Sequence, residues 1–258
     1  LDDIKVNMSP NIRLFLMIAI ISFLILFFSI KLDSVDLIFL NTWLSNNLFN
    51  TIFILLCFLF IINGANLIDG FNGLLTIHLL IINLILLFVN LENNQNQLIS
   101  AIAAQVVILL CFLLFNFPKA KMFLGDGGSY LFGTLVVINI IKTNNLNLEI
   151  SSFFFCVLLF YLFFEVFFSF FRKIYLKKSP LKPDENHLHM LSFKWLANLK
   201  KFNDCNYLNS IFINIVYLSL ILPAIIFKDN GIFCRYWFFF LIAFYILLYF
   251  RLYSFVKK

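Results

Sequence analysis

Residues 74–91 read LLTIHLLIINLILLFVNL, a run without a single Lys, Arg, Asp or Glu. A helix that crosses a bilayer needs about 20 predominantly apolar residues, so this run has the length and character of a membrane span. The whole chain is similar, because 62% of its 258 residues are hydrophobic and only 12% are charged. Soluble domains are about 45–50% apolar and about 25% charged. The sequence therefore predicts an all-α, polytopic helical membrane protein.

Similar apolar runs recur along the chain and predict about eight transmembrane helices. Two of the runs, 48–62 and 129–141, are short for a span and are expected to borrow flanking residues or to thin the bilayer locally. No internal repeat or linker divides the sequence, so we expect a single multi-pass domain over residues 1–258, with a basic loop at 172–208. The predicted spans are 11–30, 48–62, 74–91, 97–116, 129–141, 150–171, 209–227 and 236–254.

Basic residues are distributed unevenly over the two sides of this predicted bundle. Of the 19 Lys and Arg residues, only Lys31, Lys142, Lys228 and Arg235 fall on the side opposite the chain termini. The positive-inside rule therefore makes the side that holds the termini cytoplasmic. The membrane also accounts for the net charge of +6, so no nucleic-acid partner is expected. The five cysteines lack Cys-x-x-Cys spacing, which argues against a zinc ribbon or a redox pair.

Four polar segments gather on the predicted cytoplasmic side, whereas the other side carries only Asn-rich connectors such as 92–97. Taken singly, each segment also fits an ordinary turn, helix cap or solvated loop. Together they suggest one site at the membrane surface, because carboxylates at a membrane are costly and usually functional. The segments are Asp2-Asp3, Asn63–Gly73, Phe123–Ser129 and Pro183–His189.

The carboxylates in these segments would repel one another at a common site, and a divalent cation would remove that conflict. Mg²⁺ prefers oxygen ligands and usually takes one or two carboxylates together with substrate phosphates; Mn²⁺ is the alternative. Glycines beside Asp69 and Asp126 would let backbone N–H groups approach an anion. Lys5, Lys119, Lys121 and the histidines could add positive charge. This set of residues fits diphosphate chemistry at a membrane surface.

The motifs resemble, in order, those of the polyprenyl-phosphate N-acetylhexosamine-1-phosphate transferase family, which is glycosyl transferase family 4 and includes the bacterial phospho-N-acetylmuramoyl-pentapeptide transferase. The segment from Asn63 to Leu74 is similar to the family's Asn-x-x-Asn-x-x-Asp-Gly-x-Asp/Asn-Gly-Leu stretch. Phe123–Ser129 is similar to its Phe-Met/Leu-Gly-Asp-x-Gly-Ser loop, and Pro183–His189 to its histidine motif. The resemblance extends from Asp2 to His189 and covers most of the chain.

The resemblance implies that the chain transfers a sugar 1-phosphate. A UDP-N-acetylhexosamine would donate N-acetylhexosamine-1-phosphate to undecaprenyl phosphate, and UMP would leave. The lipid-linked product would serve a cell-envelope polysaccharide such as O-antigen or teichoic acid. The expected location is the bacterial cytoplasmic membrane, with the active site on its cytoplasmic face. The sequence leaves the sugar, the polymer and the oligomeric state open, a homodimer included.

The resemblance also assigns roles to individual residues. Asp126 matches the Mg²⁺ ligand of the family. Asp2 matches a carboxylate proposed either as a base or as a nucleophile, and Asp3 would help to position the metal or the acceptor. Since a phosphate monoester has a second pKa near ~6, the acceptor is already mostly dianionic at neutral pH. We therefore expect direct in-line attack, with charge neutralisation contributing more than proton transfer.

The remaining assignments concern the donor. The family's pattern gives Asn66, Asp69 and Asn72 to the nucleotide side, although Asn72 stands where some members have Asp. Phe123 matches a position that can stack on uracil. His187 and His189 match phosphate- or sugar-facing histidines, and Lys5 and Lys121 would contribute to substrate binding.

Some features depart from the family or allow two interpretations. The family normally has helices before the Asp-Asp pair, so we expect an N-terminally truncated member. Met190 stands where the pentapeptide transferase continues with His, which favours simple UDP-N-acetylhexosamines. The pentapeptide transferase remains the alternative, and a membrane transporter is a distant one. Glu165, inside the sixth predicted span, either reaches the cytoplasmic site or pairs with Arg172.

Overall fold

Helices account for all of the regular secondary structure in the described part of the computed structural model. That part comprises residues 9–180, 182, 184–199 and 204–256. The helices are α1 (Pro10–Phe27), α2 (Ile38–Leu44), α3 (Asn47–Ile68), α4 (Leu74–Glu92), α5 (Asn96–Asn116), α6 (Gly125–Leu146), α7 (Ser152–Leu158), α8 (Phe160–Tyr175), α9 (Leu188–Asn198), α10 (Cys205–Ile226) and α11 (Gly231–Val256).

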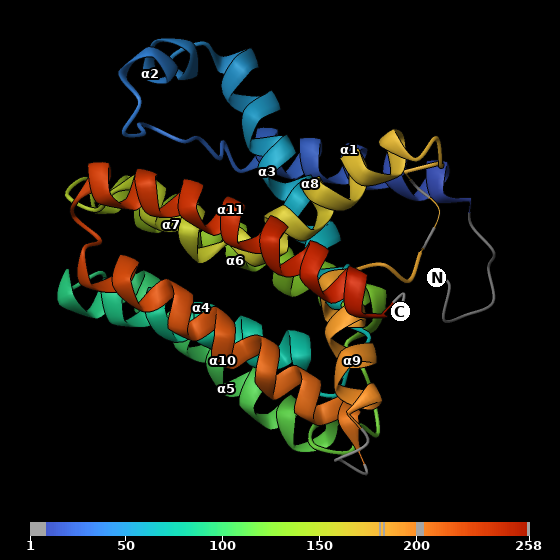
Figure 1. Cartoon of the computed structure of the whole chain (residues 1–258). Coiled ribbons are helices and arrows are strands. Elements are labelled where there is room, and N and C mark those ends of the chain that lie inside the picture. Colours follow the sequence, from blue (N-terminus) through green and yellow to red (C-terminus); the bar gives the residue numbers. More distant parts are fainter. Residues whose placement is uncertain (1–8, 181, 183, 200–203, 257–258) are drawn as a thin grey trace.

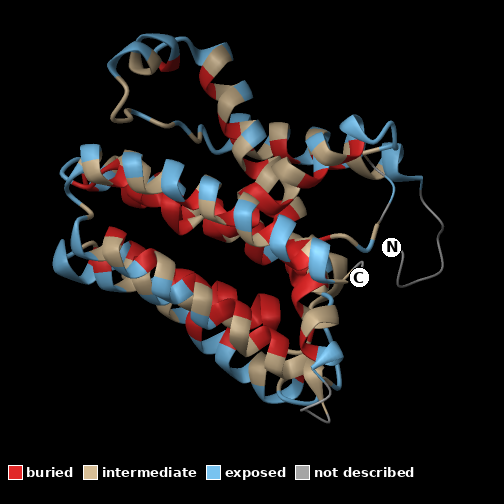
Figure 2. Cartoon of the chain, in the orientation of Figure 1, coloured by how far each residue is buried: buried red, intermediate tan, exposed pale blue. Residues whose placement is uncertain are grey.

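Long helices stacked side by side form the body of the molecule (Figure 1). α4 packs against α5 and α10, α11 packs against α7, and α3 crosses between α6 and α8. The short helix α9 contacts both α10 and α11 near one end of the bundle. α2 and the connection before it project from the opposite end of α3. Figure 2 shows that buried residues lie where the helices face one another.

Large apolar side chains cover much of the outer surface, including Phe15, Phe23, Leu114, Phe239 and Leu247. A soluble monomer rarely exposes such a continuous apolar surface. Among the described residues, six helices are long and apolar enough to cross a membrane, and α7 with α8 provides a seventh span if the bent pair counts as one. The prediction of a polytopic helical membrane protein is therefore confirmed.

The predicted count of eight spans is slightly high by this measure. Residues 125–146 form a 22-residue helix, α6, but it is not among the candidate spans. The predicted sixth span is broken at Leu159, where α7 and α8 meet at an angle of 70°. The short runs do borrow flanking residues, as expected, because α3 extends from Asn47 to Ile68. The expected loop at 63–73 is wrong over 63–68, because these residues form the last turns of α3.

Two glycines set how closely the elements around the polar segments approach one another. A Cβ at Gly64 would lie 2.2 Å from the carbonyl oxygen of Leu162, so α3 and α8 touch backbone to backbone at this crossing. Gly73 has φ +76°, in the left-handed region that glycine adopts without strain, and it ends the turn that leads into α4. The first glycine fixes the position of the helix that carries Asn66, and the second that of the loop that carries Asp69.

Candidate active site

Asp126 lies in the first turn of α6 and receives contacts from two other helices. Asn66 of α3 donates from Nδ2 to Asp126 Oδ1 at 2.6 Å, and Arg13 of α1 places Nη1 3.1 Å from Oδ2. About a third of each side chain of the Arg13–Asp126 pair remains exposed. The helix N-terminus adds partial positive charge at the same place. The charge of Asp126 is thus balanced by Arg13 and the helix N-terminus, and a ligand can still reach the carboxylate.

Asp69 lies beside Asp126, at the C-terminal end of α3. Its Oδ2 accepts a hydrogen bond from Gly125 N at 2.7 Å, which joins the end of α3 to the start of α6. Burial raises the pKa of Asp69 to about 6, although hydrogen bonds from the backbone of Leu124 and Gly125 oppose the rise; the charge of Asp126 adds to it. Bringing the two acids together therefore costs free energy, which a bound cation would reduce.

Hydrogen bonds from three directions hold the loop after Asp69. The backbone N–H of Asn72 donates to Asn206 Oδ1 at 2.7 Å, and its side-chain Nδ2 donates to the carbonyl of Pro118 at 2.8 Å. The N–H of Gly73 donates to Asn116 Oδ1 at 2.9 Å. The loop is therefore fixed to the ends of α5 and α10, and its shape is set before any substrate binds.

The same loop contacts the histidine segment. Phe71 is buried, and its ring lies 5.7 Å from the ring of His189 in an edge-to-face arrangement. Phe71 also packs against Phe193 of α9. Through Asp69 on one side and Phe71 on the other, this loop brings together the segments 63–73, 123–129 and 184–189. Asp2, Asp3 and Lys5 lie outside the described residues.

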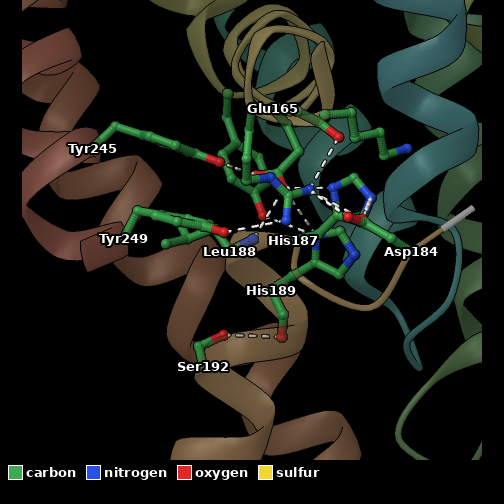
Figure 3. A network of polar contacts seen from close by, with 12 residues as sticks. Glu165, Asp184, His187, Leu188, His189, Ser192, Tyr245 and Tyr249 are labelled. Carbon is green, nitrogen blue, oxygen red and sulfur yellow. Dashed lines mark hydrogen bonds and ion pairs between the residues drawn. The ribbon is translucent and has the colours of Figure 1, made fainter. Parts of the chain in front are cut away.

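A second polar cluster surrounds Glu165, which is almost fully buried in α8 (Figure 3). Its Oε1 lies 3.1 Å from Nδ1 of His187 and accepts the N–H of Leu188 at 2.9 Å. Its Oε2 accepts the hydroxyl hydrogen of Tyr245 at 2.8 Å. Of the two interpretations of Glu165, the pair with Arg172 is wrong, because Arg172 binds elsewhere.

Arg172 binds Asp184 instead. Its Nη2 lies 3.0 Å from both carboxylate oxygens of Asp184, and its Nη1 donates to the hydroxyl of Tyr249 at 3.2 Å. Burial by itself would raise the pKa of Asp184, but hydrogen bonds from His187 and Arg172 hold it well below its usual range. The opposite trend at His187 has the same origin: burial lowers its pKa, and the hydrogen bonds to Asp184 and Glu165 more than offset this and raise it.

His189 differs from His187 in its surroundings. It is fully buried, which lowers its pKa to about 4, with Glu165 opposing the change. Its Nδ1 lies 3.5 Å from the hydroxyl of Tyr161, and its Nε2 has no hydrogen-bond partner in the described part of the chain. The rings of His187 and His189 stack at 5.6 Å. The pKa values of the two histidines of one motif are therefore shifted in opposite directions.

A groove of about 340 Å³ extends from Asp126 between α1, α3 and α6. Arg13 and Asp126 form its polar end, with Tyr130 beside them. The rest of the groove is almost wholly apolar. Its lining there includes Leu16, Met17, Ile20, Ile21, Leu24 and Ile62. The arrangement suits a molecule with a charged head and a hydrocarbon tail.

Phe123 and Lys121 lie on the connection that precedes Asp126, and both side chains are exposed. The Phe123 ring makes no aromatic contact within the described residues, and 45% of the surface of the residue is accessible. An exposed ring three residues before Asp126 can stack on a planar ligand.

The residues around Asp126 fit a magnesium ion only if a substrate supplies most of the ligands. Within the described ranges, no three His, Cys, Asp or Glu side chains lie close enough together to hold an ion. Asp69, Asp126 and the Asn66 amide provide oxygen atoms on neighbouring elements. This matches the preference of Mg²⁺ for one or two carboxylates with substrate phosphates and water.

Sequence reasoning missed three participants in these clusters. Arg13 lies near the start of the first predicted span with no motif around it, so the sequence alone does not indicate its contact with Asp126. Asn206 and Tyr245 lie far along the chain in segments without a motif, so no local pattern could have singled them out. Only the fold brings them to the site.

Comparison with known proteins identifies the family of the chain. The family model for glycosyl transferase family 4 matches residues 1–144, more than half of the chain. An undecaprenyl-phosphate alpha-N-acetylglucosaminyl 1-phosphate transferase of Thermotoga maritima is 27% identical over 70% of this chain and 61% of its own length. A probable undecaprenyl-phosphate N-acetylglucosaminyl 1-phosphate transferase of Bacillus subtilis is 34% identical over 50% of this chain and 36% of its own.

A phospho-N-acetylmuramoyl-pentapeptide-transferase of Leuconostoc mesenteroides is 41% identical over a shorter region, 30% of this chain and 24% of its own length. The chain thus spans about three fifths or less of these relatives. The resemblance read from the motifs is confirmed: the chain belongs to glycosyl transferase family 4.

Proposed function

We propose that this protein transfers N-acetylhexosamine-1-phosphate from a UDP-sugar to undecaprenyl phosphate at the cytoplasmic face of a bacterial membrane, with release of UMP. The observation that carries the proposal is the accessible Asp126, compensated by Arg13 and Asn66, at the polar end of an apolar groove. A soluble nucleotide sugar and a membrane-anchored phosphate can meet only where the two environments join.

The groove supports a polyprenyl acceptor. The hydrocarbon chain of the lipid would lie along the face of α1 that carries Leu16, Ile20 and Leu24. Each CH₂ group buried there would add to the hydrophobic stabilisation of the complex. The phosphate would then stand beside the Arg13 guanidinium, which is suited to bind phosphate oxygens in pairs.

The nucleotide side is supported by the elements beyond Asp126. Phe123 precedes Asp126 by three residues, and the loop after Asp69 is held by Asn116 and Asn206. A uracil ring stacked on the exposed Phe123 would place the diphosphate near the N-terminus of α6, whose N–H groups favour an anion.

Magnesium is proposed at Asp126, with Asp69 and Asn66 as neighbouring oxygen donors, and Mn²⁺ as a substitute. When bound, the ion would neutralise charge on the donor diphosphate and make its sugar-linked phosphorus more electrophilic. Asp69 would be fully ionised in its presence, since a nearby cation lowers the raised pKa of this buried acid.

The bond changes are those of a phosphoryl transfer. An oxygen of the acceptor phosphate attacks the sugar-linked phosphorus, the bond from that phosphorus to the bridging oxygen breaks, and UMP leaves with that oxygen. Arg13 would hold the acceptor, and Asn66 would keep Asp126 oriented. We retain Asp2 as the residue that orients the acceptor or takes a residual proton; trapping a covalent phosphoryl-enzyme would contradict this one-step pathway.

The second candidate is the pentapeptide transferase of peptidoglycan synthesis. Shared segments with relatives of that name favour it, but the N-acetylglucosaminyl 1-phosphate transferase of Thermotoga maritima matches over 70% of this chain, against 30% for the Leuconostoc mesenteroides pentapeptide transferase. Met190 after His189 also fits the simpler donor.

The test is an assay of the full chain in membranes with undecaprenyl phosphate, Mg²⁺ and either radiolabelled UDP-N-acetylglucosamine or UDP-N-acetylmuramoyl-pentapeptide. We expect labelled lipid and an equal amount of UMP from the first donor, and none after chelation by EDTA. The variant Asp126→Asn serves as the matched negative control. Turnover of the pentapeptide donor alone would favour the second candidate, and turnover of neither donor would overturn the proposal.

A further inference from the structure

We propose that Glu165 is a positioning residue, which fixes the histidine motif in the geometry needed for sugar-phosphate transfer. This inference rests on the proposed function and deepens it. The motif's own residues lie on α9 and the loop before it, whereas Glu165 lies in α8 and has so far no role in the reaction.

The contacts of Glu165 join three separate elements. Its Oε1 receives the N–H of Leu188, the first residue of α9, and also the Nδ1 of His187. Its Oε2 receives the hydroxyl of Tyr245, which approaches from α11 on the side opposite Asp184 (Figure 3). One buried carboxylate therefore fixes the start of α9, the first imidazole of the motif and the last helix of the chain.

The geometry also fixes the charge of His187. Nδ1 lies 3.1 Å from Glu165 Oε1, and Nε2 lies 3.1 Å from Asp184 Oδ1. Since an ionised carboxylate only accepts hydrogen bonds, both ring nitrogens have to donate, and the ring is an imidazolium. His187 then has no nitrogen left for a substrate while these contacts last.

His189 has the complementary arrangement. Its ring is held by the stack on His187 and by Phe71, and its Nε2 is buried without a partner among the described residues. A buried polar atom without a hydrogen bond is costly, and such atoms usually have a reason to be there. We infer that Glu165, through His187, orients His189 as the ring that meets the substrate.

The charges around the cluster balance. The ionisable groups that face His187 are Glu165 from α8, Asp184 from the preceding loop, His189 from α9 and Tyr245 from α11. Arg172 binds Asp184 and donates to the hydroxyl of Tyr249. Tyr161 contacts His189, and the Lys173 ammonium binds the carbonyls of Pro180 and Lys182. With His187 charged, two carboxylates meet one guanidinium and one imidazolium, so the inner cluster is neutral.

A role limited to folding makes different demands. Glu165 could stabilise the bundle simply by filling its site with hydrogen bonds, and Gln would then replace it with little loss. The positioning role requires the negative charge itself, because only an anion keeps His187 doubly protonated at neutral and higher pH.

The decisive variant is therefore Glu165→Gln, with Glu165→Asp as the conservative replacement. For Glu165→Gln we expect kcat to fall roughly tenfold or more with KM for the UDP-sugar nearly unchanged. The alkaline limb of the kcat–pH profile should move to lower pH by about one unit, because His187 loses its proton more easily. Glu165→Asp should restore the profile in part.

A matched pair of hydroxyl deletions provides the control. Tyr245→Phe removes one hydrogen bond from Glu165 and should lower kcat about two- to fivefold. Thr143→Val removes one buried hydrogen bond from Asn90, in α4 and α6 away from the cluster, and should leave kcat and its pH profile unchanged. If Glu165→Gln does not fold, Glu165→Asp and Tyr245→Phe decide the question in its place.

A second measurement does not depend on activity. The chain has only three histidines, so ¹⁵N-histidine NMR in micelles can follow the rings individually. We expect His187 to be doubly protonated at pH 8 in the wild type and singly protonated in Glu165→Gln. Inactive wild-type protein would refute the proposed function, and the NMR result would still decide whether Glu165 holds His187. Unchanged kcat, pH profile and His187 resonances in Glu165→Gln would overturn the inference.

Discussion

The Asp126 and Glu165 clusters both pair acids with bases, but they differ in how much solvent reaches them. Asp126 meets Arg13 across a partly exposed contact at the end of a groove. Glu165 is buried, and its two carboxylate oxygens are bound by His187 and Tyr245 of the protein itself. The Asp126 carboxylate therefore has room for a ligand beside it, whereas the Glu165 carboxylate is enclosed by protein groups.

This difference suggests a division of labour. Exposed ion pairs contribute little to stability, about 0–1 kcal/mol, so the Arg13–Asp126 pair can be exchanged for contacts with phosphate at small cost. A buried network is costly to break, because removing one partner leaves an uncompensated charge. The open cluster is therefore suited to bind and the closed cluster to hold, and substitutions should separate the two.

The largest effect is expected from Asp126→Asn in the open cluster. Loss of the carboxylate should reduce kcat roughly 10²–10³-fold, because an amide binds a cation weakly and the diphosphate charge is left unneutralised. UMP release measured over a range of Mg²⁺ concentrations should show partial recovery at high Mg²⁺. Wild-type turnover by this variant would remove Asp126 from the reaction.

Arg13→Ala should have the next largest effect. Loss of a charged hydrogen-bond donor at the acceptor phosphate should raise KM for undecaprenyl phosphate about 10–100-fold, and Arg13→Lys should recover part of the affinity. The comparison with KM for the UDP-sugar, which should change much less, identifies the side on which Arg13 acts. Lys142→Ala, at an exposed position near the other end of α6, is the control.

Phe123→Ala tests the nucleotide side of the open cluster. Stacking on a base is worth about 1–3 kcal/mol, so the dissociation constant for UMP should rise about tenfold. Phe123→Tyr should retain the affinity, because the ring is what stacks. Equal UMP affinity for the wild type and Phe123→Ala, measured by calorimetry, would place the uracil elsewhere.

The smallest effect, on thermal stability, should have opposite signs at two acids. Burial raises the folded-state pKa of Asp69 to about 6, so this residue stabilises the fold only at low pH, and that contribution is lost as the pH rises through about 6. The pKa of Asp184 is lowered, so this residue stabilises the fold at neutral pH. That stabilisation is lost as the pH falls below the ordinary pKa of an aspartate.

At pH 7.5, Asp69→Asn should therefore raise the Tm and Asp184→Asn should lower it, each by roughly 2–5 °C. Tryptophan fluorescence in detergent measures both. At pH 4, the difference between Asp69→Asn and the wild type should largely disappear. A fall in Tm for Asp69→Asn at pH 7.5 would show that the ionised Asp69 side chain does not destabilise the fold.

Much of the fold could be predicted from hydropathy, because each span has to be apolar over a fixed length. Hydropathy did not predict the last turns of α3, which carry Asn63 and Asn66, because these turns are polar and do not resemble a membrane span. The break at Leu159 escaped it as well: both sides of the bend are equally apolar, and no Pro or Gly marks the position.

The site could be predicted only as far as its motifs are local in sequence. Asp69 and Asp126 each stand in a short glycine-containing segment that can be recognised alone. Other participants come from elsewhere in the chain: Arg13 of the first helix pairs with Asp126, Asn206 at the start of α10 holds the loop after Asp69, and Tyr245 in the middle of α11 binds Glu165. Residues without a local pattern can be assigned only once tertiary contacts are known.

The backbone contact between Gly64 and Leu162 has a mechanical consequence. Asn66, which binds Asp126, follows Gly64 by two residues, and Glu165 follows Leu162 by three. Asn66 and Glu165 therefore both lie close to the point where α3 and α8 cross, one on each helix. A tilt of α8 against α3 in the bilayer would move the anchor of the histidines and the anchor of Asp126 in concert, so the binding cluster and the holding cluster cannot be displaced independently.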